Sequence, residues 1–154
     1  MKPSTCVLGA VALMGLSCDR NLDTLDGHDL GQPTSAVFSR DDNGHVMVVM
    51  SNLTDLCETL AEADSPTTDD FWVLSAWTHV GVDEPDEYAV EAYVAVSTNQ
   101  EIEEYDTEAG GMTFSRLDAD MIKGRLDITF PGNDRVKAHI TADYCEADLF
   151  VGMY

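Results

Sequence analysis

The chain has 154 residues, of which 29 are Asp or Glu and 8 are Lys or Arg, so its formal net charge is -21 at pH 7. Recognition of nucleic acid phosphates and of anionic lipid head groups normally begins with Lys and Arg. We therefore expect the acidic surface to repel both, and the composition excludes nucleic acid as the expected partner. The acidity itself has two interpretations, a specific role or simple solubility in a saline habitat.

Residues 1–17 have the pattern of an export signal. Lys2 supplies a positive charge, residues 7–16 form an apolar stretch, and small residues come shortly before Cys18. The apolar stretch is shorter than the ~20 residues of a spanning helix. A signal that ends on cysteine is typical of bacterial lipoproteins, so we expect Cys18 to become the acylated N-terminus. The alternative is plain secretion, because Leu16 stands where a lipoprotein signal usually has a small residue.

Residues 18–34 are expected to form an acidic linker between the lipid anchor and the domain. They contain several Asp, Gly and Pro residues, and their large apolar residues are three leucines. Such a composition buries little surface and predicts a flexible tether. Asp26 and Asp29 resemble calcium-loop ligands, but Leu22 occupies the place of the first EF-hand ligand.

The domain is expected to span residues 35–154, with two short strands at its start. Residues 36–38 and 46–50 favour strands, and residues 41–44 favour a hairpin turn. The second strand is wholly apolar, which indicates burial on both faces.

A short helix is expected next, ending near residue 63. Apolar residues recur at three- and four-residue spacing from residue 53 to residue 60, and Ser51 or Asn52 can cap the first turn. This spacing places Cys57 on the inward face of the helix.

The rest of the domain is expected to be strands and one long acidic loop. Residues 71–80 and 88–97 favour strands, and residues 99–111 form the expected loop. The sequence predicts four further strands, over residues 112–117, 121–130, 136–144 and 147–154. Residues 121–130 and 136–144 alternate so that each has one apolar face, and they are expected to pair as a hairpin with a mixed-charge outer face.

The cysteine count supports lipidation. Cys6 leaves with the signal, so Cys18, Cys57 and Cys145 remain in the exported chain. An odd count in an oxidising compartment leaves one thiol to explain. If Cys18 is acylated, Cys57 and Cys145 can form a disulfide. The alternative is two buried thiols that never meet.

The late block of the chain resembles predicted lipoproteins of myxobacteria. The resemblance rests on residues 111–114, 123–130, 134–136 and 142–145, together with Leu56, Cys57 and Leu60. It implies a small, mostly β domain that is closed by a disulfide between the helix and the last hairpin. It implies no activity, and this chain departs from the pattern by continuing past Cys145.

The sequence shows no catalytic motif. Its four histidines are scattered singly, and no nucleophile elbow or phosphate-binding loop is present. Two acidic clusters are candidates for weak calcium binding if the fold brings them together. They are Asp83, Glu84, Asp86 and Glu87, and Glu101, Glu103, Glu104, Asp106 and Glu108.

Aromatic residues offer a second kind of candidate surface. Phe71, Trp72, Trp77 and Tyr93 lie on adjacent expected strands. Two Trp residues five positions apart face opposite sides of a regular strand, so one is expected in the core and the other partly exposed. The exposed one is a candidate platform for carbohydrate or an envelope protein.

Together these observations predict an antiparallel β-sandwich of about eight strands with one short helix, or alternatively an eight-stranded β-barrel. We expect a non-enzymatic lipoprotein that is exported to the cell envelope, held on a membrane through Cys18, and active in binding or scaffolding. The alternatives are a weak calcium-dependent adhesion module and a hydrolase whose site is assembled only in three dimensions.

Overall fold

A computed structural model describes residues 22–62 and 70–150. This part of the chain contains ten strands and one helix, α1 (Leu56–Glu62). The strands are β1 (Leu22–Leu25), β2 (His28–Gly31), β3 (Ser35–Arg40), β4 (Val46–Ser51), β5 (Phe71–Thr78), β6 (Glu87–Thr98), β7 (Glu101–Asp106), β8 (Ala109–Leu117), β9 (Met121–Thr129) and β10 (Arg135–Tyr144).

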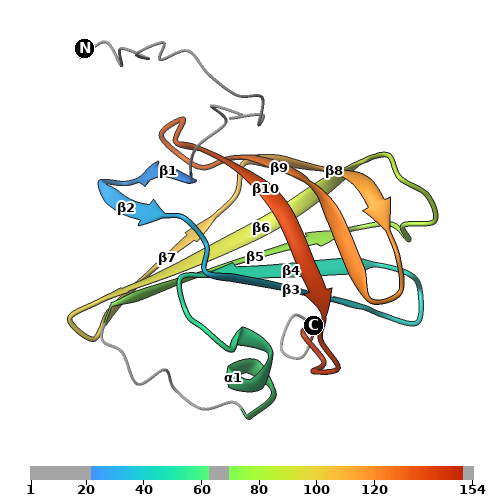
Figure 1. Ribbon diagram of the computed structural model, residues 1–154. Helices are drawn as coiled ribbons and strands as arrows, with labels where there is room; N and C mark the ends of the chain where they lie inside the picture. The colour runs from blue at the N-terminus through green and yellow to red at the C-terminus, as the bar shows by residue number, and fades with distance from the viewer. Residues whose placement is uncertain (1–21, 63–69, 151–154) are drawn as a thin grey trace, which may run out of the picture.

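Seven of the strands close into a barrel (Figure 1). The ladder runs β5-β4-β3-β10-β9-β8-β6, and β6 pairs back onto β5. All neighbours in this ring are antiparallel except β3 and β10, which are parallel. The predicted sandwich is therefore wrong. The β-barrel alternative is correct as a class, but seven strands form the closed ring and β7 is an extra strand beside β6.

The barrel differs from the predicted sandwich because of two ladders, one between the consecutive strands β5 and β6 and one between β3 and β10, which are distant in sequence. The β5–β6 ladder extends over eight pairs of residues, from Phe71↔Ser97 to Thr78↔Val90, and the β3–β10 ladder closes the other side. An alternating strand has the same sequence in a sandwich and in a barrel. Only the choice of partner strand distinguishes the two folds.

The predicted hairpin of the last two strands is confirmed. β9 and β10 pair along their length, from Arg135↔Thr129 to Asp143↔Met121. The inner faces of both strands contribute to a core in which Ile122, Leu126 and Ile140 are at most 2% exposed. The outer faces carry the charged residues, as the alternation predicts.

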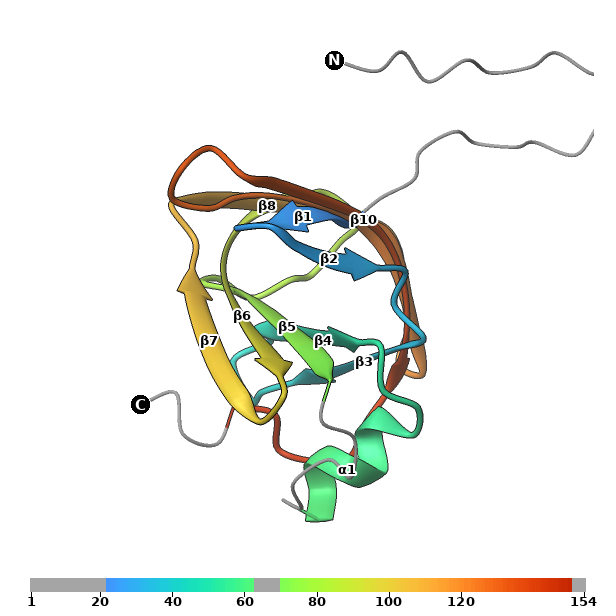
Figure 2. The ribbon, with the colours of Figure 1, turned by 90° about the vertical axis from the view of Figure 1, so that its left-hand side faces the viewer.

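β4 is buried on both faces, also as predicted. Val48 points into the barrel core, whereas Met47 and Val49 belong to a second apolar cluster on the outside of the barrel. This outer cluster is covered by α1 and by the segment after β10, including Leu56 and Phe150. Figure 2 shows α1 against the outside of the barrel, below β3 and β4.

The first described residues are part of the domain, which corrects the predicted linker over residues 18–34. β1 and β2 form a hairpin, and its Leu25 and Leu30 are 1% and 3% exposed within the barrel core. Asp26 and Gly27 form its turn, with φ angles of 47° and 86°. Asp-Gly is a strong signal for a two-residue turn with positive φ, and the hairpin follows from it. Residues 22–31 are thus not a flexible tether.

The acidic segment after β6 is a strand rather than the predicted loop. β7 pairs with the second half of β6, from Thr98↔Glu101 to Tyr93↔Asp106, and β8 begins at Ala109. The side chains of β7 are mostly exposed, so no apolar alternation indicates this strand in the sequence. Charged side chains are common on edge strands, where they discourage pairing with another chain.

The predicted last strand and the predicted helix cap are also corrected. Residues 147–150 form a bend and a turn, and the remaining residues of the predicted strand, 151–154, lie outside the described residues. The helix begins at Leu56. Ser51 Oγ donates to the Trp72 carbonyl and Asn52 Oδ1 accepts from the Trp72 N–H, so both side chains hold β5 instead of capping α1.

Gly124 marks the closest approach of β8 and β9 and leads to a testable prediction. A Cβ at this position would lie 2.2 Å from the Thr113 carbonyl oxygen, which is backbone and cannot move away alone. We expect Gly124→Ala to lower the free energy of unfolding by about 2 kcal/mol through overpacking. Urea unfolding measures the change.

Gly111→Ala is the matched control for this substitution. The nearest atom to a Cβ there is Glu87 Oε1 at 3.2 Å, the end of a flexible side chain. Its effect on unfolding should therefore be small. Equal destabilisation by Gly111→Ala and Gly124→Ala would contradict the backbone contact as the cause.

Candidate functional site

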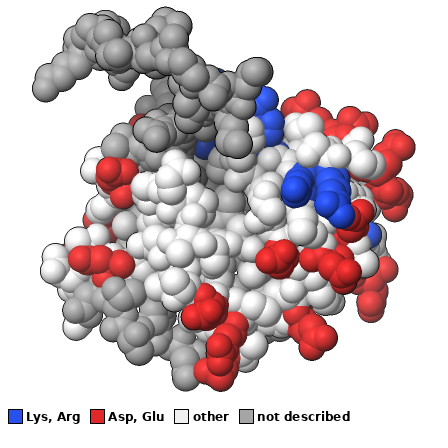
Figure 3. All heavy atoms as spheres, in the orientation of Figure 1, with Lys and Arg blue, Asp and Glu red and all other residues white. Residues whose placement is uncertain are grey.

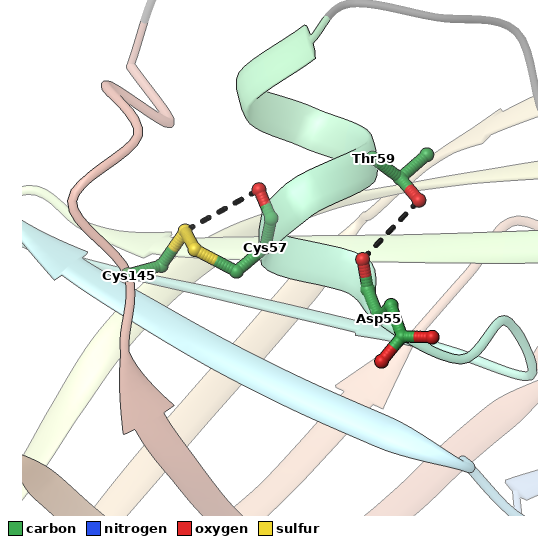
Figure 4. Close-up of a disulfide and its surroundings, with 4 residues drawn as sticks. All are labelled: Asp55, Cys57, Thr59 and Cys145. Atoms are coloured by element: carbon green, nitrogen blue, oxygen red, sulfur yellow. Dashed lines mark hydrogen bonds between the residues drawn. A yellow bond between two sulfur atoms is a disulfide. The ribbon is translucent and has the colours of Figure 1, made fainter.

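Cys57 and Cys145 form a disulfide, which confirms the predicted pairing (Figure 4). Their Cα atoms are 5.6 Å apart, and 88 residues separate them in sequence. Cys57 lies in α1 and Cys145 directly follows β10. Cys145 is 1% exposed, and its N–H donates to the Phe38 carbonyl of β3 over 2.8 Å.

The disulfide lies at the shortest ladder of the barrel. β3 and β10 share only two pairs of residues, Val37↔Asp143 and Phe38↔Tyr144. α1 packs on β3, so the bond from α1 to the end of β10 ties these two strands together. The disulfide therefore fastens the point where the barrel closes with the fewest ladder hydrogen bonds.

Cys18, the predicted lipidation site, lies outside the described residues. Of the three cysteines in the expected exported chain, the disulfide uses Cys57 and Cys145. The acylation of Cys18 stays a prediction. Within the described residues, no helix is long and apolar enough to cross a membrane.

The structure does not bring the two predicted calcium clusters together, so a joint site is a wrong prediction. Glu87 pairs with Thr113 at the start of β6, whereas the second cluster lies along the other half of β6, from Glu101 opposite Thr98 to Asp106 opposite Tyr93. The part of β6 between Glu87 and Tyr93 spans roughly 20 Å, so even the nearer end of the second cluster is well separated from Glu87. Within residues 22–62 and 70–150, no group of three or more His, Cys, Asp or Glu is arranged to hold a metal ion.

One residue of the second cluster instead holds the β1–β2 hairpin. Glu103 Oε2 lies 2.6 Å from His28 Nε2 and accepts a hydrogen bond of 2.9 Å from the Tyr105 hydroxyl. The hydrogen bonds from His28 and Tyr105 hold the pKa of the Glu103 carboxyl below its usual value. Burial and the Glu103 carboxylate raise the pKa of Tyr105 to about 12. His28 and Glu103 are 75 positions apart, so no local sequence signal reveals their contact.

The two Trp residues face opposite sides of β5, as predicted. Trp72 is 3% exposed in the barrel core, and its Nε1 has no hydrogen-bond partner among the described atoms. Trp77 is partly buried against the outer cluster. Tyr93 pairs across from Ser75, and burial together with a hydrogen bond to Glu104 raises its pKa to about 12. An aromatic platform at Trp77 stays a prediction.

Positive charge is concentrated on the outside of β8, β9 and β10. We call this surface the basic strip, and its members are Arg116, Lys123, Arg125, Arg135 and Lys137. Arg135 forms two hydrogen bonds of 2.6 Å to Asp127, and these hold the pKa of the Asp127 carboxyl below its usual value. Arg116 pairs with Asp118 at the end of β8. The sequence indicated a mixed-charge outer face here but not its extent across three strands.

Comparison of the chain with protein-family models, with curated proteins and with solved structures finds no match. The resemblance to predicted lipoproteins of myxobacteria therefore stays a prediction. The disulfide that the resemblance implied is present in the structure.

Proposed function

We propose that this protein is a non-enzymatic lipoprotein of the cell envelope, anchored through acylated Cys18, where it binds or scaffolds another envelope component. The observation that supports the proposal most strongly is the Cys57–Cys145 disulfide. Disulfides persist in exported proteins and are rare in the reducing cytosol. The export signal over residues 1–17 and the disulfide therefore point independently to the same compartment.

The interior of the barrel favours binding on the outer surface. Large apolar side chains such as Phe38, Leu74 and Phe130 fill the core and are at most 2% exposed. A small closed barrel packed in this way has side chains where a ligand-binding barrel has its cavity. An envelope protein or carbohydrate would then be bound by the outer faces of the strands and by the loops.

Metabolic labelling with an alkyne-tagged fatty acid tests the anchor. The mature wild-type protein should carry the label and fractionate with membranes, and Cys18→Ala should lose essentially all label because the acyl-accepting cysteine is gone. In-gel fluorescence after coupling to an azide dye measures the label.

Cys6→Ala is the matched control, because Cys6 lies within the expected signal and leaves with it. This variant should label as the wild type does. An unlabelled wild type, or a Cys18→Ala variant that keeps its label, would overturn the proposed anchor.

A further inference from the structure

The basic strip is an exception on a strongly acidic protein. The exported chain from residue 18 onward has 7 Lys and Arg, since Lys2 is lost from 8, and five of the seven belong to the strip. Strands β8, β9 and β10 hold these five and only two acidic residues, Asp127 and Asp143, giving 5 - 2 = +3. The whole exported chain is 7 - 29 = -22, so everything outside the three strands sums to -25.

The strip is continuous across the three strands. Arg116 of β8 pairs with Lys123 of β9, and Lys137 of β10 pairs with Asp127. The side chains of Arg116, Arg135 and Lys137 are 52%, 55% and 55% exposed. Figure 3 shows Lys and Arg atoms gathered on one part of the surface, with Asp and Glu atoms around them.

The folded β1–β2 hairpin places the expected lipid anchor near the same strands. β1 lies beside β10, and the Asp26 N–H donates to Asp134 Oδ2 just before β10 begins (Figures 1 and 2). β1 starts at Leu22, only four residues after Cys18. A chain of four residues reaches at most about 14 Å. An acylated Cys18 therefore keeps the hairpin close to the membrane surface, together with the strands that contact it, which include β10 and, through Glu103, β7.

We propose that the basic strip docks on the anionic head groups of the membrane in which Cys18 is anchored, and that it sets the orientation of the barrel there. This inference rests on the proposed lipid anchor. The acyl chains attach the protein to the membrane. The strip therefore has only to determine which face of the barrel lies against the membrane. Screening in physiological salt limits electrostatic interactions to about 8 Å, and the charge of the nearest face then outweighs the net charge of the protein.

The acidic strand β7 favours the same orientation. It carries Glu101, Glu103, Glu104 and Asp106. Anionic head groups repel these residues. A barrel held on a short connection with the strip toward the membrane keeps the carboxylates of β7 in solvent.

The lysine content of the chain provides a direct test. The exported chain has two lysines, Lys123 and Lys137, and both belong to the strip. The acylated protein is placed in vesicles of phosphatidylcholine alone or with phosphatidylglycerol, and an amine-reactive reagent that does not cross membranes is added. Mass spectrometry then gives the rate of modification of each lysine. We expect at least about threefold slower modification in the anionic vesicles, with the difference lost near 1 M salt.

Arg40→Lys supplies the matched control. Arg40 is exposed at the end of β3, outside the strip, and this substitution keeps its charge. The introduced lysine should react at the same rate in both kinds of vesicle. Equal slowing of all three lysines, or no slowing of Lys123 and Lys137, would overturn the proposed orientation.

Two other outcomes would overturn the inference and have distinct signatures. Slowing that depends on protein density in zwitterionic vesicles would mean that the strip faces a second copy of the protein. A protein whose intact mass shows no acyl chains would overturn the anchor itself, and the orientation with it. An acylated protein without protected lysines would overturn only the orientation.

Discussion

Cys145→Ser is expected to lower the free energy of unfolding by about 4 to 5 kcal/mol, because the disulfide closes a loop that covers most of the domain. The two cysteines are 88 residues apart in sequence, so the expected stabilisation lies near the upper end of the range that loop-closure entropy gives. The loss should lower the melting temperature by roughly 15 °C in a domain of this size. Thermal and urea unfolding, each followed by circular dichroism, measure the effect.

The position of the disulfide predicts where the weakened barrel opens. The Cys145 N–H donates to the Phe38 carbonyl at the two-pair junction of β3 and β10. In Cys145→Ser, hydrogen exchange should accelerate first at this junction and at α1, and later at the β9–β10 hairpin.

Two controls distinguish the effect of losing the disulfide bond from the effect of replacing the cysteine side chain. Reduction of the wild type should reproduce the loss in stability, and reductant should leave Cys145→Ser unchanged. A double variant, Cys57→Ser with Cys145→Ser, should be about as stable as either single variant, since each removes the same bond. If the free energy of unfolding stays the same after reduction and in each of these variants, the disulfide contributes no stability.

Leu25→Ala is expected to cost about 3 kcal/mol, because Leu25 is 1% exposed in the barrel core and its truncation leaves a cavity there. The side chain comes from the β1–β2 hairpin, which covers the barrel beside β10. Urea unfolding with an unchanged m-value would show the loss as stability rather than as a change of the denatured state.

Val80→Ala is the matched control for this truncation. Val80 is 57% exposed, so removing its methyl groups should change stability by less than about 0.5 kcal/mol. If residues 22–31 were a detachable linker, Leu25→Ala would be as harmless as Val80→Ala. That result would contradict the assignment of the hairpin to the domain.

Elements with strong local signals were predictable from the sequence. The hairpin of β9 and β10 follows from two alternating segments separated by a Pro-Gly-Asn-Asp turn. The burial of β4 on both faces follows from five consecutive apolar residues. The pairing of Cys57 with Cys145 agrees with a cysteine count that leaves out Cys6 of the predicted signal and the predicted lipidation site Cys18.

Elements without a clear apolar alternation, and contacts between distant residues, were not predicted in this way. β7 has the composition of a loop, and only the ladder with β6 makes it a strand. The hairpin of β1 and β2 was missed because its leucines are few, although Asp26 and Gly27 carried the turn signal. The contact of His28 with Glu103 joins residues that no local pattern relates.

By itself, the sequence determined the net charge, the cysteine count and the alternation of its strands, because each depends on residues close together in the chain or on composition alone. Tertiary structure decided that the strands close into a barrel, that the two acidic clusters lie along different parts of β6, and that the basic residues form one strip. The physical reason is that strand pairing joins distant backbone segments through hydrogen bonds common to all residues, so side-chain patterns alone do not select the partner.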